Sequence, residues 1–218
     1  MSESKDLLNF GMQMLDLGNI EAAIKAFTRS IELAPGEFEP WFQLAQALKK
    51  LGKSDRAIQA LEKATSLNPH HFDALMQLGQ ALHDAGEYDA AIATFKKSIR
   101  IAPDRYDGWF NLGLSLSESH IFDEAMDSFD KASKLNPDFP KFWYNIGRGM
   151  AGKGNMICAM KVLEKAVLVD PEDGSAWFQL AMVYFKLGKK SEAGAAITKA
   201  IELDPRDQAF KAFQELLG

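Results

Sequence analysis

The sequence predicts an all-α fold of six consecutive helical hairpins, and three observations support this prediction. Prolines recur at one spacing of 34 residues. They are Pro35, Pro69, Pro103, Pro137, Pro171 and Pro205. Each 34-residue unit contains two stretches with one-sided helical periodicity, and a glycine separates them in all but one unit. Counting each proline as position 32 places the repeats at 4–37, 38–71, 72–105, 106–139, 140–173 and 174–207.

The first stretch of each unit predicts a helix, called helix A. Apolar or small residues occupy positions 4, 7, 8 and 11, which is the pattern of a helix with one buried face. All four tryptophans stand at position 4, and leucine takes that position in the other two units. The residues at position 4 are Leu7, Trp41, Leu75, Trp109, Trp143 and Trp177. Position 8 is always glycine or alanine, so we expect it to allow a close approach of helices while position 4 fills a wider gap.

The second stretch predicts helix B, with alanine at position 20 and Phe, Leu or Ile at position 24. Position 15 between the helices is Gly18, Gly52, Gly86, Gly154 and Gly188, with His120 in the fourth unit. We expect these glycines to end helix A in a left-handed conformation. The proline at position 32 then ends helix B.

The last eleven residues predict a capping helix, 208–218, because Phe210, Phe213, Leu216 and Leu217 stand at helical spacing. A single hairpin cannot bury both of its faces, so stacking on neighbours supplies the core and the ends need caps. We therefore expect a single domain over residues 1–218.

These repeats resemble the tetratricopeptide repeat family, whose signature is W-x2-L-G-x2-Y, A-x3-F and P. The fourth unit has Trp109, Leu112 and Gly113, followed by Ala125 and Phe129. The resemblance covers residues 4–207, and His120 and the scarcity of Tyr at position 11 depart from it. It implies a right-handed α-solenoid, a superhelix of six hairpins with the A helices on its concave side, which binds a peptide segment of a partner protein.

Composition and charge argue against several other classes of protein. The net charge of -5 disfavours binding to nucleic acid or anionic membranes, which needs a clustered basic excess. No apolar run approaches the length of a membrane span. The single cysteine, Cys158, cannot form an intramolecular disulfide. We expect a soluble, cytoplasmic protein without a membrane span.

No motif points to catalysis, a metal or a cofactor. Residues 147–152 satisfy G-x-G-x-x-G, but that motif needs a preceding strand and here lies within a predicted helix A. The four histidines, His70, His71, His83 and His120, lack the spacing of metal ligands. Cys158 is better interpreted as a small buried hydrophobe than as a nucleophile. We expect no enzyme activity.

The candidate binding surface is the side of helix A opposite its buried face. At about 100° per residue, positions 2, 6, 9 and 13 lie on this side, with 5 and 12 at its flanks. Position 6 is an amide in every unit: Asn9, Gln43, Gln77, Asn111, Asn145 and Gln179. Position 5 is apolar or aromatic, so we expect it to pack on the adjacent helix A. The partly exposed edges of Phe110, Tyr144 and Phe178 are the candidate ligand contacts there. The amide row is similar to the asparagine ladder of O-linked GlcNAc transferases, but amides at position 6 are also a general habit of these repeats, and both interpretations stay open.

Other side chains on the same face give weaker signals. Phe178, Met182 and Phe185 form an apolar strip that could be a pocket or the seat of the cap. Acidic residues gather mid-array and basic ones toward the C-terminal end. The acids are Asp73, Asp84, Asp107 and Glu118, and the basic residues are Lys141, Arg148 and Lys186.

The predicted function is a peptide-binding adaptor for a partner protein. One alternative is a self-assembling scaffold that forms a homo-oligomer. Another is a substrate-recognition module for a separate enzyme such as a glycosyltransferase. The carboxylate clamp of the heat-shock cochaperones is disfavoured, because Leu8, Met12, Phe42 and Gln46 stand where it needs lysine and asparagine.

Overall fold

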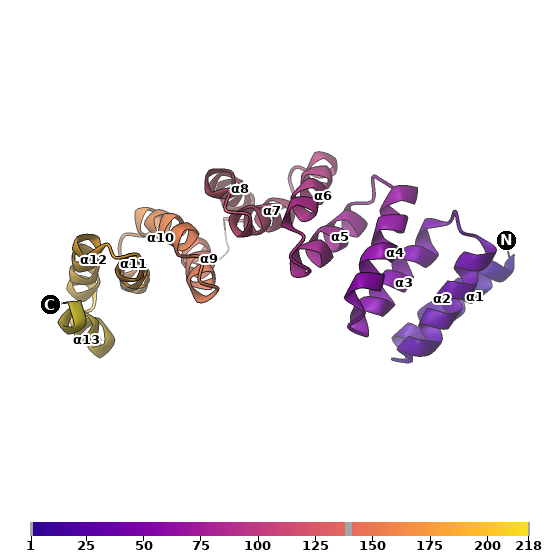
Figure 1. Ribbon diagram of the computed structural model, residues 1–218, viewed down its shortest axis with the longest axis horizontal. Helices are drawn as coiled ribbons and strands as arrows, with labels where there is room; N and C mark the ends of the chain where they lie inside the picture. The colour runs from indigo at the N-terminus through magenta and orange to yellow at the C-terminus, as the bar shows by residue number, and fades with distance from the viewer. Residues whose placement is uncertain (1, 138–140, 218) are drawn as a thin grey trace. The chain divides into compact units, whose positions relative to one another are not determined.

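The computed structural model describes residues 2–137 and 141–217, and every helix or strand in this part of the chain is an α-helix. In chain order the helices are α1 (Ser2–Asp16), α2 (Ile20–Leu33), α3 (Phe38–Lys50), α4 (Ser54–Leu67), α5 (Phe72–Asp84), α6 (Tyr88–Ile101), α7 (Tyr106–Glu118), α8 (Phe122–Leu135), α9 (Phe142–Gly152), α10 (Met156–Val169), α11 (Gly174–Lys186), α12 (Lys190–Leu203) and α13 (Gln208–Leu217). Odd-numbered helices up to α11 are the predicted helices A, and even-numbered ones are the helices B (Figure 1).

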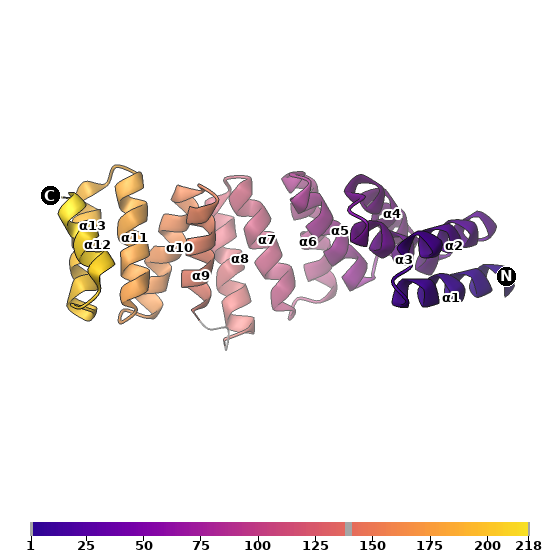
Figure 2. The same cartoon turned by 90° about the horizontal axis from the view of Figure 1, so that it is seen from below.

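The chain divides into two compact units, residues 1–115 and 116–218, and the boundary falls within α7. In unit 1 the pairs α1/α2, α3/α4 and α5/α6 each pack together, and α2 also packs on α3 and α4 on α5. In unit 2, α9/α10 and α11/α12 pack in the same way, and α13 packs on α12 (Figure 2). The predicted all-α solenoid of packed helix pairs is confirmed. That residues 1–218 form one domain stays a prediction.

The turn between helix A and helix B has the left-handed conformation that was predicted for the position-15 glycines. The five glycines at position 15 have φ between 71° and 86°, and His120 takes the same left-handed conformation with φ 62°. In the second repeat the amide of Lys53 donates to the carbonyl of Leu48 at 2.9 Å, and the amide of Gly52 donates to Lys49 at 3.0 Å. This pair of bonds is the Schellman motif, which satisfies the last carbonyls of helix A.

The core of each hairpin lies where position 8 of helix A meets position 24 of helix B. A Cβ atom added to Gly79 would lie 2.5 Å from the ring of Phe95, which is fully buried. Gly11 meets Phe27 in the same way. Where position 8 is Ala45 or Ala181, position 24 carries the smaller Leu61 or Ile197. The two positions therefore share one volume, because interiors are packed without room for an extra methyl group.

A hydrogen bond that the sequence did not suggest ties three tryptophans to the preceding repeat. The indole Nε1 of Trp41 donates to the carbonyl of Pro35 at 3.0 Å. Trp109 and Trp177 donate to Pro103 and Pro171, each at 2.9 Å. Position 4 is thus an apolar plug whose polar edge also fixes the loop after the preceding helix B.

Helix α9 is shorter than its counterparts because it begins two positions later. Its N-cap residue, Lys141, has the left-handed φ of 49°. Phe142 occupies position 3, which is small in four other repeats: Pro40, Ala74, Gly108 and Ala176. A Cβ atom on Gly108 would lie only 3.1 Å from Cγ1 of Ile99 in the preceding helix B. A phenylalanine at so tight a position gives a physical reason for the late start of α9.

Candidate functional site

The position-6 amides all lie at least partly open to solvent. Asn9 and Asn145 are exposed, and Gln43, Gln77, Asn111 and Gln179 are half-buried. The position-8 residues two places further along each helix are buried in every repeat. Unit 1 carries the first four amides and unit 2 the last two. Each unit therefore presents amides on the side of its helices A that faces away from the hairpin core.

Asn111 and Gln43 already make hydrogen bonds within their own helices. Nδ2 of Asn111 donates to the backbone carbonyl of Asp107 at 2.8 Å. Nε2 of Gln43 donates to Oε1 of Glu39 at 2.7 Å. If such an amide gives up this bond to bind a ligand, the binding free energy it contributes is only the difference between the two hydrogen bonds. We therefore expect a net contribution of about 1 kcal/mol per contact.

The position-5 side chains divide into packing residues and surface residues. Phe42 is buried, its ring stacks on Phe38 with centroids 5.4 Å apart, and His71 lies 5.2 Å from it. His71 also accepts a hydrogen bond from the amide of Ala74 and so caps α5. Phe110 and Tyr144 are half-buried.

Phe178 is in contact with the C-terminal helix. Its ring centroid lies 4.8 Å from that of Phe210 and 5.7 Å from that of Phe213. Phe213 also meets Phe185 edge-on, with centroids 5.7 Å apart. Of the two interpretations of the apolar strip on α11, the seat of the cap is the one that the structure supports. A ligand could use only the remaining exposed part of Phe178.

Two cations lie within cation–π distance of the Tyr144 ring. Nζ of Lys141 is 5.5 Å from its ring centroid, and Cζ of Arg148 is 5.7 Å from it. Lys141 also forms an ion pair with Asp173 at 3.1 Å. The sequence placed these basic residues on the same face as Tyr144, but their contact with its ring became visible only in the structure.

The structure shows where the motifs lie that were considered for nucleotide binding, thiol reactivity and metal binding. Residues 147–152 lie within α9 rather than in a phosphate-binding loop. Burial raises the pKa of the Cys158 thiol to about 11, so the reactive thiolate is scarce near neutral pH. Within the described residues, no group of three or more His, Cys, Asp and Glu side chains could hold a metal ion. None of the helices described is long and apolar enough to cross a bilayer.

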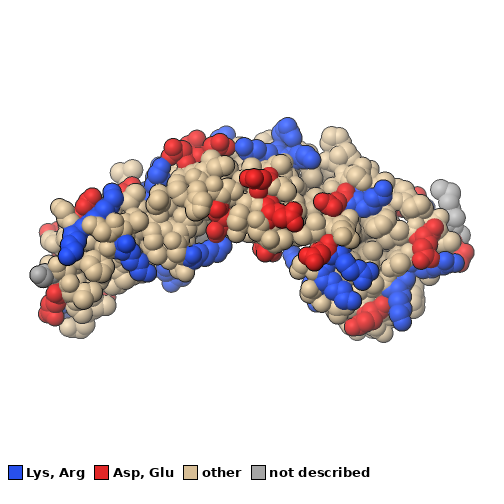
Figure 3. Space-filling view, in the orientation of Figure 1, with Lys and Arg blue, Asp and Glu red and all other residues tan. Residues whose placement is uncertain are grey.

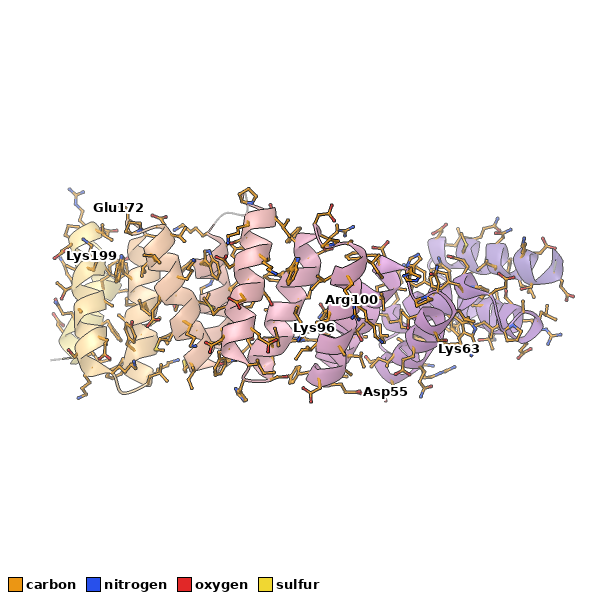
Figure 4. The ribbon with its side chains drawn as sticks, turned by 90° about the horizontal axis from the view of Figure 1, so that it is seen from above. Asp55, Lys63, Lys96, Arg100, Glu172 and Lys199 are labelled. Atoms are coloured by element: carbon orange, nitrogen blue, oxygen red, sulfur yellow. The ribbon has the colours of Figure 1, made fainter. Side chains whose placement is uncertain are left out.

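The outer faces of the B helices are charged and carry both signs. Figure 4 labels Asp55 and Lys63 on α4, Lys96 and Arg100 on α6, and Lys199 on α12, all of them projecting from the helices. Position 22 on these faces varies and reads Lys25, Gln59, Ala93, Asp127, Lys161 and Ala195. Position 26 is basic in every repeat: Arg29, Lys63, Lys97, Lys131, Lys165 and Lys199. The A helices therefore carry a repeated amide, and the B helices a repeated cation.

Comparison with known proteins places this architecture in a family. The tetratricopeptide repeat family matches residues 14–65, 42–106, 106–139 and 174–207, which together cover more than half of the chain. The chain belongs to the tetratricopeptide repeat family. No match was found among the curated proteins.

Several solved structures share the fold. YrrB, described as a TPR protein with an unusual peptide-binding site, is 21% identical with a TM-score of 0.58, and the match covers 88% of this chain and 99% of YrrB. MamA from Desulfovibrio magneticus RS-1 is 20% identical with a TM-score of 0.60, covering 95% and 98% of the two chains. A tetratricopeptide repeat protein from Parabacteroides merdae is 15% identical with a TM-score of 0.66, covering 100% and 99%. At these identities the likeness concerns the fold alone.

Proposed function

We propose that this chain is a non-catalytic scaffold that binds an extended segment of a partner protein along the solvent-facing side of its helices A. The observation that carries the proposal is the amide at position 6, which recurs in all six repeats and is nowhere buried. Proteins of the tetratricopeptide repeat family are generally protein-interaction scaffolds, and the peptide-binding site of YrrB lends support from the same fold.

Amides suit the recognition of a peptide main chain. Each offers two N–H donors and a carbonyl acceptor, which can pair with backbone C=O and N–H groups whatever side chains the ligand carries. Helices that pack side by side are about 8–10 Å apart. An extended chain advances about 3.3 Å per residue. Successive amides within one unit would thus meet every third residue or so of the ligand.

Unit 1 offers the clearest test, because Gln77 and Asn111 belong to consecutive helices A of that unit. Once a partner has been isolated by affinity capture, calorimetry compares the wild type with the double variant Gln77→Ala/Asn111→Ala. At about 1 kcal/mol for each lost hydrogen bond, we expect affinity to fall about tenfold or more. Helicity and melting temperature should change little, since both side chains lie outside the hairpin core.

The matched control is Gln59→Ala, which removes an exposed amide from helix B of the second repeat. This variant should bind like the wild type. Wild-type affinity in the Gln77/Asn111 variant would instead mean that the amide row is only a habit of the repeat, and the proposal would fail.

A further inference from the structure

The charge on the solvent-facing side differs between helices A: α5 and α7 are acidic there, including Glu118 of unit 2, whereas the side of α9 and α11 is basic. In unit 1, α5 and α7 carry Asp73, Asp84 and Asp107 at positions 2 and 13. In unit 2, basic residues stand at position 2 just before α9, at position 9 of α9 and at position 13 of α11, namely Lys141, Arg148 and Lys186. No acidic residue occupies positions 2, 5, 6, 9, 12 or 13 of α9 and α11. The space-filling view shows Lys and Arg side chains along the edge of the molecule near α9 and α11 (Figure 3).

Lys141, the N-cap residue of α9, and Arg148 within α9 are not equivalent, because among the described residues Lys141 has an acidic partner and Arg148 has none. Lys141 pairs with Asp173, whose side chain is 6% exposed and which also accepts a hydrogen bond from the amide of Ser175 at 3.1 Å. Lys141 thereby compensates a buried carboxylate at the start of α11. Arg148 is exposed, and among the residues that the structure describes no carboxylate lies within ion-pair distance of it.

Arg148 lies beside the ring of Tyr144. The two residues are four apart on α9, so they share one face of the helix, and the guanidinium lies 5.7 Å from the ring centroid. Contact with an aromatic ring reduces the freedom of the long side chain and leaves its N–H groups available to an acceptor. A guanidinium fixed in this way is suited to a bidentate pair with a carboxylate.

We propose that the solvent-facing side of α9 and α11 binds an acidic segment of the partner, with Arg148 pairing to an Asp or Glu carboxylate beside Tyr144. This inference rests on the proposed function, because it assigns a charge preference to the unit 2 part of the same surface. A nucleic acid fits less well, since three cations in a chain of net charge -5 can neutralise few phosphates.

The test uses the full chain and three ten-residue probe peptides with blocked ends, in which Ala alternates with Glu, Lys or Gln. Binding is followed by NMR of the labelled protein at low salt. The Glu peptide should perturb resonances of α9 and α11 and bind more tightly there than the Gln peptide. Arg148→Glu should weaken its binding at least tenfold, whereas Arg206→Glu, which alters an exposed cation after α12, should leave it unchanged.

The contrary outcomes separate the two proposals. Equal binding of the Glu and Gln peptides on α9 and α11, or an Arg148→Glu variant that binds the Glu peptide normally, would overturn the charge preference and leave the scaffold proposal intact. Tighter binding of a ten-residue oligothymidylate than of the Glu peptide at these residues would also overturn it. If none of the three peptides perturbs any helix A, both proposals fail.

Discussion

At the scale of single residues, the hairpin is specified by pairs of positions rather than by one position at a time. Gly79 leaves no space for a Cβ atom because the ring of Phe95 fills it. The repeats with alanine at position 8 have a smaller side chain at position 24. The fifth repeat pairs Gly147 with Leu163, and a Cβ atom on Gly147 would lie 2.5 Å from Leu163. The hairpins thus divide the same space between their two helices in more than one way.

A double-mutant cycle in the third repeat can test whether positions 8 and 24 share one volume. Gly79→Ala should destabilise the protein by about 1–3 kcal/mol, because the new methyl group overlaps a fully buried ring. In the background of Phe95→Leu the same substitution should cost less, with a coupling energy of at least about 0.5 kcal/mol. Urea unfolding of the four proteins gives this coupling. Additive effects would show that the two positions do not share one volume.

At the scale of the helix, α9 begins late in its repeat and contains two glycines whose lack of a side chain is not needed for packing against any neighbouring residue. An added Cβ atom at Gly149 or Gly152 would find no other atom within 4 Å. Interior glycine weakens a helix relative to alanine. The fifth repeat should therefore open more readily than its neighbours, and amide hydrogen exchange should be faster in residues 143–154 than in 109–118.

Two alanine substitutions around α9 should have effects of opposite sign. Gly149→Ala should raise the free energy of unfolding by about 1 kcal/mol, because it restores helix propensity without a clash. Gly154→Ala should lower it, because Gly154 has φ +86° and alanine is strained in that conformation. Thermal and urea unfolding of both variants measure the effects. A Gly149→Ala protein no more stable than the wild type would show that flexibility at this position is not the weakness of the repeat.

Most of the fold followed from the sequence, because the period and the buried faces are local signals that recur in all six repeats, and the turn glycine recurs in five of them. The sequence did not predict which atoms the individual aromatic rings contact. Helical spacing places Trp41 on a face but does not say that its indole reaches the carbonyl of Pro35. The amide row was predicted to lie at the surface, and all six amides are at least partly exposed. That the row binds a ligand stays a prediction. Phe178 could not be assigned, because its environment depends on how the offset C-terminal helix docks.

At the scale of the whole molecule, a hairpin in a stack of repeats buries its second face only where another helix packs on it. In unit 2, Phe210 of α13 completes a buried cluster with Ala181, Ala196, Ile197 and Ala200. Partly buried side chains pack around this cluster, namely Trp177, Phe178, Tyr184, Ile201, Phe213 and Leu217. The other side of α13 carries exposed Lys211, Gln214 and Glu215. This helix thus has one apolar and one polar face, as a cap requires.

Deleting residues 208–218 should expose the apolar side of the sixth hairpin, lower the melting temperature and promote association, because a contiguous apolar patch at a surface drives self-contact. Phe210→Ala is a smaller change that should cost about 3–5 kcal/mol, since the ring is almost fully buried. The matched control is Leu216→Ala on the same helix, where the side chain is 67% exposed and the cost should be small. Light scattering across a concentration series and thermal unfolding measure both effects. If the shortened protein stays monomeric and melts at the wild-type temperature, α13 is not a cap, and the apolar side of α12 must be covered in another way.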